Sequence, residues 1–217
     1  MVRFTLAVIL CATVSSIARA EIVVDPAGDL LPTYSSGPAN GDLDVLSSEV
    51  VFDRQANTLA FTATHADDIG LTDGALYVWG LDRGQGTERF LTGDPAIGAG
   101  VFFDSVLILR PDGTGSYVDL FNGGSVDLAP GSVSIDGGTI ASTELPLSLF
   151  PSTGFAPEDY TWNLWPRVGL GANNQITDFA PDASNAGLTT VPEPASVVLV
   201  MFGAAAAAVG LVRRRLG

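Results

Sequence analysis

The sequence predicts an all-β protein: an antiparallel β-sandwich of about nine strands, between an N-terminal signal peptide and a single C-terminal transmembrane helix. Three observations favour this class. Apolar and polar residues alternate in short runs, Gly, Pro, Asn and Asp separate the runs, and no long segment of the core has helical period. The part between the two flanking segments has about 170 residues, a length typical of one domain.

Residues 1–20 have the features of a signal peptide. The basic Arg3 precedes an apolar run, and the small residues Ala18 and Ala20 fit cleavage by signal peptidase before Glu21. We therefore expect export through the Sec translocon and a mature chain that starts at Glu21.

Strands are predicted where the alternation has a period of two. Leu59, Phe61 and Ala63 form one apolar face in residues 59–63. Residues 146–150 fit a single helical turn. The other strand candidates are residues 46–52, 75–82, 104–110, 115–121, 132–136, 139–145, 159–167 and 175–179.

Residues 180–190 are rich in Ala, Ser, Asn, Gly and Thr, a composition typical of a linker. The predicted organisation is therefore a sandwich domain at residues 21–179, a linker at residues 180–190 and a C-terminal tail at residues 191–217.

The charge of the predicted mature core is strongly negative. From Glu21 to Val191 there are 23 acidic residues against 5 arginines, a net charge of −18, and the whole chain contains no lysine. Such a surface does not attract nucleic acid or anionic lipid. It fits either the binding of divalent cations or simple solubility outside the cell. The core has no cysteine, so disulfides do not stabilise it.

The tail contains a candidate membrane span. Residues 195–212 carry no charge, and 18 helical residues reach about 27 Å, close to the thickness of a hydrocarbon core. Three arginines follow at once, which favours a cytoplasmic C-terminus and an external core. A buried helix of a soluble domain is the alternative, but such a helix rarely ends a chain in three arginines.

This tail resembles the PEP-CTERM sorting signal of Gram-negative bacteria, also labelled the "ice-binding protein C-terminal" type. The resemblance implies recognition by an exosortase, transit through the inner membrane, removal of the tail, and a final place at the cell surface or in an exopolysaccharide matrix. A plain C-terminal anchor that stays attached is the alternative. The matching residues are the motif Val191, Pro192, Glu193 and Pro194, the span at residues 195–212, and the membrane stop Arg213, Arg214 and Arg215.

Two acidic segments, at residues 25–29 and 41–44, are followed along the core by strand-like segments at residues 57–61 and 74–79. In this pattern the core is similar to DOMON and family-9 carbohydrate-binding-module-like sandwiches. The resemblance implies a sandwich that binds sugars or haem. Haem is disfavoured, because His65 is the only histidine and the core has no methionine to serve as a second axial ligand.

Calcium is the one candidate cofactor, and no cofactor is certain. The same resemblance implies a Ca²⁺ site at four aspartates near the start of the core, and Ca²⁺ prefers such oxygen ligands. The alternative is that these aspartates only stabilise turns. The candidate metal ligands are Asp25, Asp29, Asp42 and Asp44. A second acidic group contains Asp67, Asp68 and Asp73.

Aromatic residues suggest a sugar-binding face. In residues 159–167 the alternation puts Trp162 on one face and Trp165 among polar neighbours on the other. Ring faces suit the C–H surfaces of sugars, although large aromatic residues more often fill a core. The candidate sugar-binding residues are Tyr77, Trp79, Trp165 and Arg167.

The sequence favours a protein that is not an enzyme. His65 precedes two aspartates, but no serine or cysteine motif accompanies it, and acidic pairs are unavoidable in so acidic a chain. The first interpretation is therefore an exported, non-catalytic surface or matrix protein. The alternatives are a carbohydrate-binding module that depends on calcium and, less favoured, a polysaccharide hydrolase.

Overall fold

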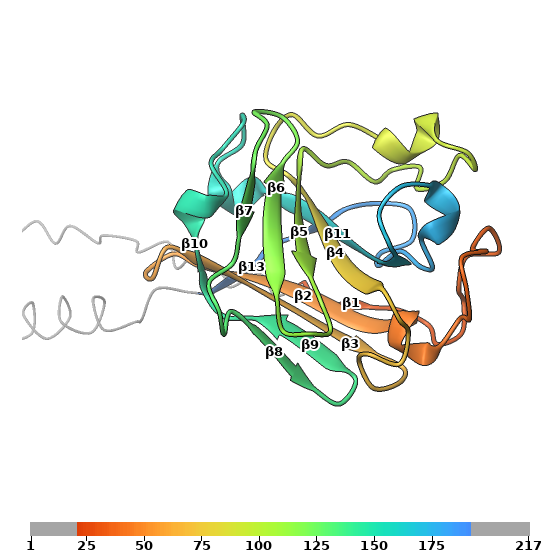
Figure 1. Cartoon of the computed structure of the whole chain (residues 1–217). Helices are drawn as coiled ribbons and strands as arrows, with labels where there is room; N and C mark the ends of the chain where they lie inside the picture. Colours follow the sequence, from red (N-terminus) through yellow and green to blue (C-terminus); the bar gives the residue numbers. More distant parts are fainter. Residues whose placement is uncertain (1–20, 192–217) are drawn as a thin grey trace, which may run out of the picture.

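The computed structural model describes residues 21–191, which form two β-sheets that face one another (Figure 1). No α-helix occurs in this range. Short 3-10 helices connect the strands, and the all-β class is confirmed. The 3-10 helices are η1 (Gly41–Leu43), η2 (Arg89–Thr92), η3 (Leu147–Leu149), η4 (Pro157–Asp159) and η5 (Asn173–Gln175).

The first sheet has the order β1-β2-β3-β9-β8, with β10 added to β3 and β13 added to β2. Its pairings are antiparallel except that β13 runs parallel to β2. Its strands are β1 (Val23–Val24), β2 (Val45–Asp53), β3 (Thr58–His65), β8 (Val133–Asp136), β9 (Thr139–Ser142), β10 (Leu145–Pro146) and β13 (Thr189–Val191).

The second sheet is antiparallel, with the order β12-β11-β4-β5-β6-β7. Its longest pairing joins β4 to β11 over eight residues, from Ala75 opposite Val168 to Asp82 opposite Thr161. Its strands are β4 (Ala75–Asp82), β5 (Ser105–Leu109), β6 (Gly115–Asp119), β7 (Ser125–Asp127), β11 (Thr161–Val168) and β12 (Ala186–Gly187).

The main hydrophobic core lies between the sheets. Phe61 of β3 meets Trp79 of β4 edge to face, with ring centroids 6.0 Å apart. The indole N–H of Trp79 donates to the Ser48 hydroxyl of β2 at 3.1 Å, so this polar group is satisfied inside the core. The two sheets are therefore joined by both apolar packing and a buried hydrogen bond.

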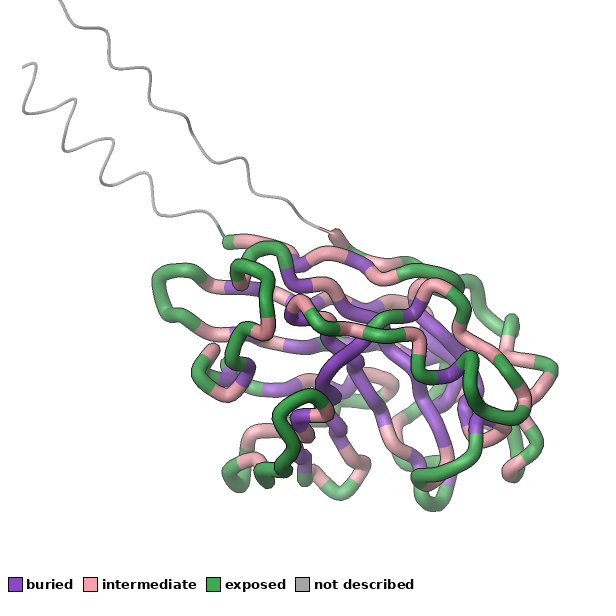
Figure 2. Tube along the Cα trace, turned by 90° about the horizontal axis from the view of Figure 1, so that it is seen from above, coloured by how far each residue is buried: buried purple, intermediate pink, exposed green. Residues whose placement is uncertain are grey.

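A second hydrophobic core covers the outer face of the second sheet. The outward side chains Val78, Ile108 and Trp165 pack against residues from two long loops, at residues 83–104 and 169–180. These loops are fastened to each other, because the Asn173 amide donates to the carbonyls of Phe90 and Pro95 at 2.7 and 2.8 Å. Strands β4, β5 and β11 are thus largely buried on both faces. Figure 2 shows buried segments, in purple, in the interior of the molecule.

Several predicted elements match the structure and one does not. The strand predicted at residues 75–82 has the bounds of β4, and η3 supplies the turn predicted within residues 146–150. The strand predicted at residues 175–179 is wrong. Instead, η5 and two isolated bridges, Arg167 to Ile176 and Leu164 to Ala180, hold this segment against β11.

The predicted linker at residues 180–190 is also a correction, because this segment belongs to the folded domain. It contributes β12 to one sheet and β13 to the other, and Ala186 and Leu188 are buried. The indole N–H of Trp162 donates to the Gly187 carbonyl at 2.8 Å. Small residues indicate local backbone freedom, but here the segment is fixed by its pairing with β11 and β2.

The two ends of the described chain lie together. Val23 of β1 pairs with Ser48, and Thr189 of β13 pairs with Val51, so both short strands follow the same edge of β2. The backbone N–H of Glu21 donates to the Thr189 hydroxyl at 3.0 Å. Figure 2 accordingly shows the described chain starting and ending on one side of the molecule.

The predicted signal peptide at residues 1–20 and the predicted transmembrane helix at residues 195–212 lie outside the described residues. Within residues 21–191, no helix has the length and apolar character needed to cross a membrane.

Candidate functional site

Five aspartates from three separate segments gather near the start of β2, and we call them the carboxylate cluster. They form two overlapping groups of three that share Asp29. Within each group, one oxygen from each residue lies within 4.8 Å of the others. The groups are Asp25, Asp29 and Asp182, and Asp29, Asp44 and Asp178.

The first segment is a tight turn that follows β1. The backbone N–H of Asp25 donates to the Leu46 carbonyl at 3.0 Å, which extends the pairing of β1 with β2. Gly28 then adopts a φ of 85°, a conformation that favours glycine, and its N–H donates to Asp44 Oδ2 at 2.8 Å. This turn places Asp29 close to both Asp25 and Asp44.

The second segment comes from the other end of the domain. Asp178 Oδ2 accepts the N–H of Val45 at 3.0 Å, and Asp178 Oδ1 accepts the N–H of Phe179 at 2.8 Å. The Asn163 amide of β11 donates to the carbonyls of Pro181 and Ser184, which holds the loop that carries Asp182. The cluster therefore depends on contacts between residues more than 130 positions apart.

The electrostatics of the cluster are unfavourable without a positive charge. Burial, followed by the neighbouring carboxylates, raises the pKa of Asp25 to about 8. Burial also raises the pKa of Asp178 to about 6, against the lowering effect of its two backbone hydrogen bonds. The pKa of Asp44 is raised too, chiefly by burial. None of the salt bridges among the described residues involves the cluster.

When the carboxylates are ionised, two oxygens of the cluster have no hydrogen-bond donor. They are Asp25 Oδ2 and Asp44 Oδ1, in side chains that are 8% and 6% exposed. A buried acceptor without a donor costs free energy, so these atoms require a ligand, a proton or water.

The structure corrects the predicted set of metal ligands. It brings Asp25, Asp29 and Asp44 together, but Asp42 points elsewhere and accepts two hydrogen bonds from Thr72, at 2.8 and 2.7 Å. Sequence analysis missed Asp178 and Asp182. The sequence contains no signal that relates these two residues to the first acidic group.

The predicted sugar-binding residues are a second correction, because all four are buried. Trp165 is 1% exposed and packs against Phe90 and Phe103 of the second core. The Arg167 guanidinium donates to the Gly169 carbonyl and to Gln175 Oε1, at 2.7 and 2.9 Å. Tyr77 and Trp79 lie in the main core. None of these side chains presents its ring or guanidinium face to a ligand.

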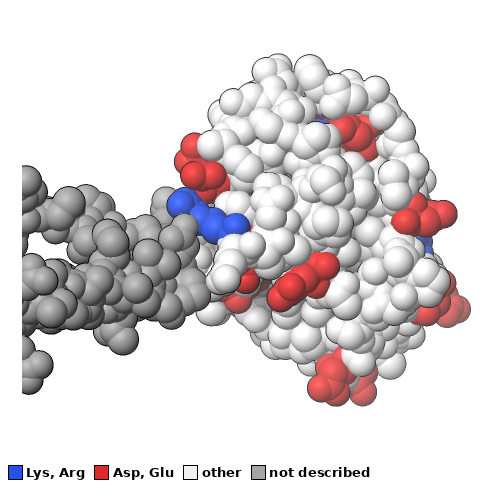
Figure 3. Space-filling model, turned by 90° about the vertical axis from the view of Figure 1, so that its left-hand side faces the viewer, with Lys and Arg blue, Asp and Glu red and all other residues white. Residues whose placement is uncertain are grey.

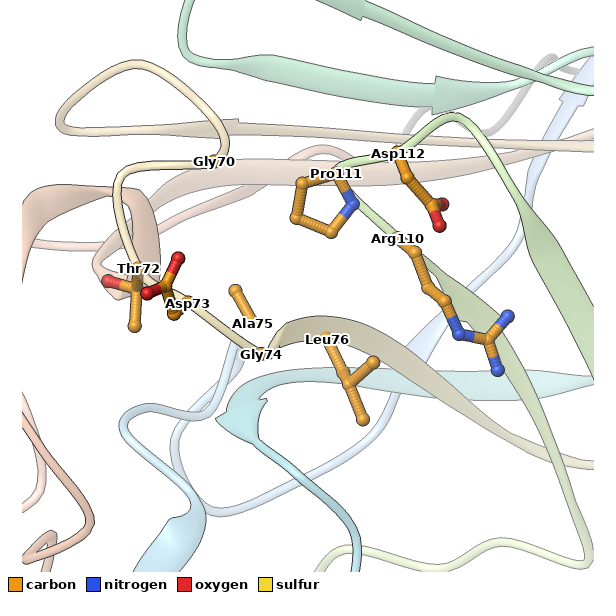
Figure 4. Close-up of a pocket in the computed structure, with 9 residues that line it drawn as sticks. All are labelled: Gly70, Thr72, Asp73, Gly74, Ala75, Leu76, Arg110, Pro111 and Asp112. Carbon is orange, nitrogen blue, oxygen red and sulfur yellow. The ribbon is translucent and has the colours of Figure 1, made fainter.

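A shallow pocket of about 310 Å³ offers a different kind of surface (Figure 4). Thr72 and Asp73 stand on one side of it, and Arg110, Pro111 and Asp112 stand on the other. The guanidinium of Arg110 already donates a hydrogen bond within the domain, to the Ser116 hydroxyl at 3.0 Å. The pocket includes no residue of the carboxylate cluster.

His65 is buried at the end of β3 and makes the domain sensitive to acid. Its ring packs on Tyr77, with centroids 4.8 Å apart, and neither ring nitrogen has a hydrogen-bond partner. Burial lowers the pKa of His65 to about 4. The backbone of Gly138 and the negative charge of Asp42 act to raise this pKa, but their effect is smaller than that of burial. The unfolded chain, with a histidine pKa of about 6.5, therefore takes up the proton first as the pH falls.

We expect this histidine to cost the domain up to about 3 kcal/mol of unfolding free energy as the pH falls from about 6.5 to about 4. The measurement is urea unfolding of the full chain and of a His65→Phe variant at several pH values. The difference in stability between the two proteins isolates the histidine from the carboxylates. As the pH falls from about 6.5 to about 4, the variant should become more stable relative to the wild type. A stability difference that stays constant over this pH range would contradict the prediction.

Comparison with protein families finds a match to the PEP-CTERM protein-sorting motif at residues 190–215. The chain therefore carries a PEP-CTERM sorting signal, which implies export, membrane-anchored transit and an exosortase as processing partner. Neither a search of curated proteins nor a search of solved structures finds a match. The resemblance of the core to DOMON and family-9 carbohydrate-binding modules is accordingly not confirmed.

Proposed function

We propose that this chain, with its PEP-CTERM signal, is an exosortase-sorted protein whose β-sandwich acts without catalysis at the cell surface or in the exopolysaccharide matrix. The sorting motif carries this proposal, because a membrane enzyme that recognises it would deliver the folded domain outside the cell. The acidic side chains in Figure 3 are spread around the face shown, which suits a solvated external surface.

The position of the motif supports processing close to the folded domain. Val191 ends β13, and Pro192 follows it directly in the chain. The folded domain therefore reaches the first residue of the sorting motif without a spacer. An exosortase that acts on Pro192, Glu193 and Pro194 would work beside the edge of β2.

The environment of His65 supports a non-catalytic domain. A general base must reach the proton that it abstracts, whereas His65 is 3% exposed and packed on Tyr77. Its lowered pKa reflects burial rather than a catalytic partner. We infer that this histidine is structural and that the domain acts by binding or by its presence in the matrix.

Replacing Pro192, Glu193 and Pro194 together by alanine should block processing of the tail. In the native host, the wild-type protein should give an intact mass that starts at Glu21 and ends between Val191 and Pro194, alone or with an added group. The triple variant should retain the mass of the arginines at its C-terminus and stay in the membrane fraction.

The control is an Asp68→Asn/Asp73→Asn variant, which changes two exposed residues away from the motif. It should be processed like the wild type. A triple variant whose tail is removed as before would refute sorting by this motif, and a wild-type mass that includes Arg215 would indicate a plain membrane anchor.

A further inference from the structure

Five carboxylates from three segments converge at the start of β2, where the turn after β1 and the loop that carries Asp178 and Asp182 meet this strand. We propose that the carboxylate cluster binds Ca²⁺ and thereby fastens the segment that leads to the sorting motif onto the N-terminal turn. This site does not depend on how the tail is processed.

The two unpartnered oxygens distinguish this cluster from the other buried carboxylates of the domain. Among the described aspartates, only Asp25 and Asp44 have a buried oxygen without a hydrogen-bond partner, and each residue is more than nine-tenths buried. In contrast, both oxygens of the buried Asp42 accept hydrogen bonds from Thr72. The fold thus satisfies the buried carboxylate of Asp42, and among the described aspartates it leaves oxygens open only in the carboxylate cluster.

The spacing of the oxygens fits one ion between them. Ca²⁺ lies about 2.3–2.6 Å from its oxygen ligands, so two ligands on opposite sides of the ion are about 4.6–5.2 Å apart. The oxygens of each group lie within 4.8 Å of one another. Asp29 belongs to both groups and would be the central ligand.

The donor set favours calcium over other metals. All the ligands are carboxylates, whereas zinc and copper sites use histidine or cysteine. Ca²⁺ accepts six to eight oxygens in irregular geometry, and carboxylates can bind it through one or both oxygens. Mg²⁺ requires a near-ideal octahedron and keeps several waters. An irregular set of carboxylates with unequal burial therefore fits Ca²⁺ better than Mg²⁺.

The unequal exposure of the ligands would allow the ion to enter from solvent and to join two segments of the domain. Asp29 and Asp182 are exposed, while Asp25, Asp44 and Asp178 are buried beneath them. An ion that enters from solvent would neutralise the mutual repulsion of these side chains. It would also join the loop at Asp182, four residues before β12, to the turn that follows β1. Calcium would therefore fasten the two terminal segments to each other at the start of β2, while Val191 pairs with Asp53 at the other end of this strand.

The test is calcium titration of the full chain, purified in detergent, by isothermal titration calorimetry and thermal unfolding. We expect a dissociation constant of about 10⁻⁴–10⁻³ M, as in extracellular calcium modules. Adding 10 mM CaCl₂ in place of EGTA should raise the Tm by about 4–8 °C. The same concentration of MgCl₂ should produce a much smaller shift.

An Asp29→Asn/Asp182→Asn variant separates calcium binding from a structural role. Both residues are exposed, and neither side chain makes a hydrogen bond to the backbone. In EGTA the variant should be at least as stable as the wild type, because repulsion is relieved, yet its Tm should no longer respond to calcium. The Asp68→Asn/Asp73→Asn variant, with the same change of charge outside the cluster, should respond fully. No calcium response in the wild type, an equal response in the two variants, or an equal effect of Mg²⁺ would overturn the proposal.

Discussion

Replacing Arg83 by methionine is expected to destabilise the domain by about 3–5 kcal/mol, because it leaves two carboxylates without their buried partner. Arg83 is fully buried at the end of β4. Its Nε donates to Asp104 Oδ1 at 2.7 Å, and its Nη2 donates to Asp119 Oδ1 at 3.1 Å. Nη1 donates to the Pro151 carbonyl at 2.9 Å, and the guanidinium lies over the ring of Tyr117. One side chain therefore joins β4 to β5, β6 and the loop after η3.

Urea unfolding of the full chain at neutral pH measures the loss. The matched control is Arg54→Met, which removes an exposed ion pair with Glu158 and should cost less than about 1 kcal/mol. A loss below about 1 kcal/mol for Arg83→Met as well would show that the buried pairs contribute little.

Acid provides a second readout for the same variant. Burial tends to raise the pKa of Asp119, but hydrogen bonds from Arg83 and Asn122 hold it at about 2. A carboxyl whose folded pKa is depressed stabilises the fold above its unfolded pKa of about 4, and this contribution is lost as the pH falls toward 2. The stability gap between wild type and Arg83→Met should therefore narrow below about pH 4.

Replacing Trp165 by alanine should cost about 3–5 kcal/mol, the usual range for emptying the site of a fully buried tryptophan. The ring is 1% exposed and lies 4.9 Å from Phe90 and 4.8 Å from Phe103, measured between centroids. Phe179 completes the enclosure from the other loop. Loss of the indole would leave a cavity beneath both loops, so hydrogen exchange in residues 83–104 should also accelerate.

The control for this prediction is Phe121→Ala. Phe121 is 54% exposed, so its truncation should change the stability by no more than about 0.5 kcal/mol. A small effect of Trp165→Ala would mean that the loops do not pack firmly on β11, and the ring would then again be available to a ligand.

Local patterns in the sequence were enough to predict most of the strands. The alternation in residues 159–167 assigned Trp162 and Trp165 to opposite faces, and the structure places them in different hydrophobic cores. The prediction succeeds because successive side chains of a strand point to opposite faces of the sheet, whatever packs against those faces. The very short strands β1, β10 and β12 were not predicted, because two residues carry no periodicity.

The candidate site was only partly predictable. Asp25, Asp29 and Asp44 could be predicted as candidate metal ligands because they lie close together in an acidic segment of the sequence. Asp178 and Asp182 join them only because the loop after β11 folds against the start of β2, where Asp178 accepts the N–H of Val45, a long-range contact without a local signature. Asp42 lies in the same acidic segment, yet it turns toward Thr72.

The sequence by itself determined the all-β class and the PEP-CTERM sorting signal, since both rest on local patterns: a period of two, and a motif with its flanking segment. The tertiary structure decided which faces are exposed and which charges meet. Two long loops cover the outer face of the second sheet, so Trp165 is a core residue rather than a binding surface. Packing of loops and convergence of distant carboxylates depend on contacts between remote residues, and a single sequence read locally does not contain them.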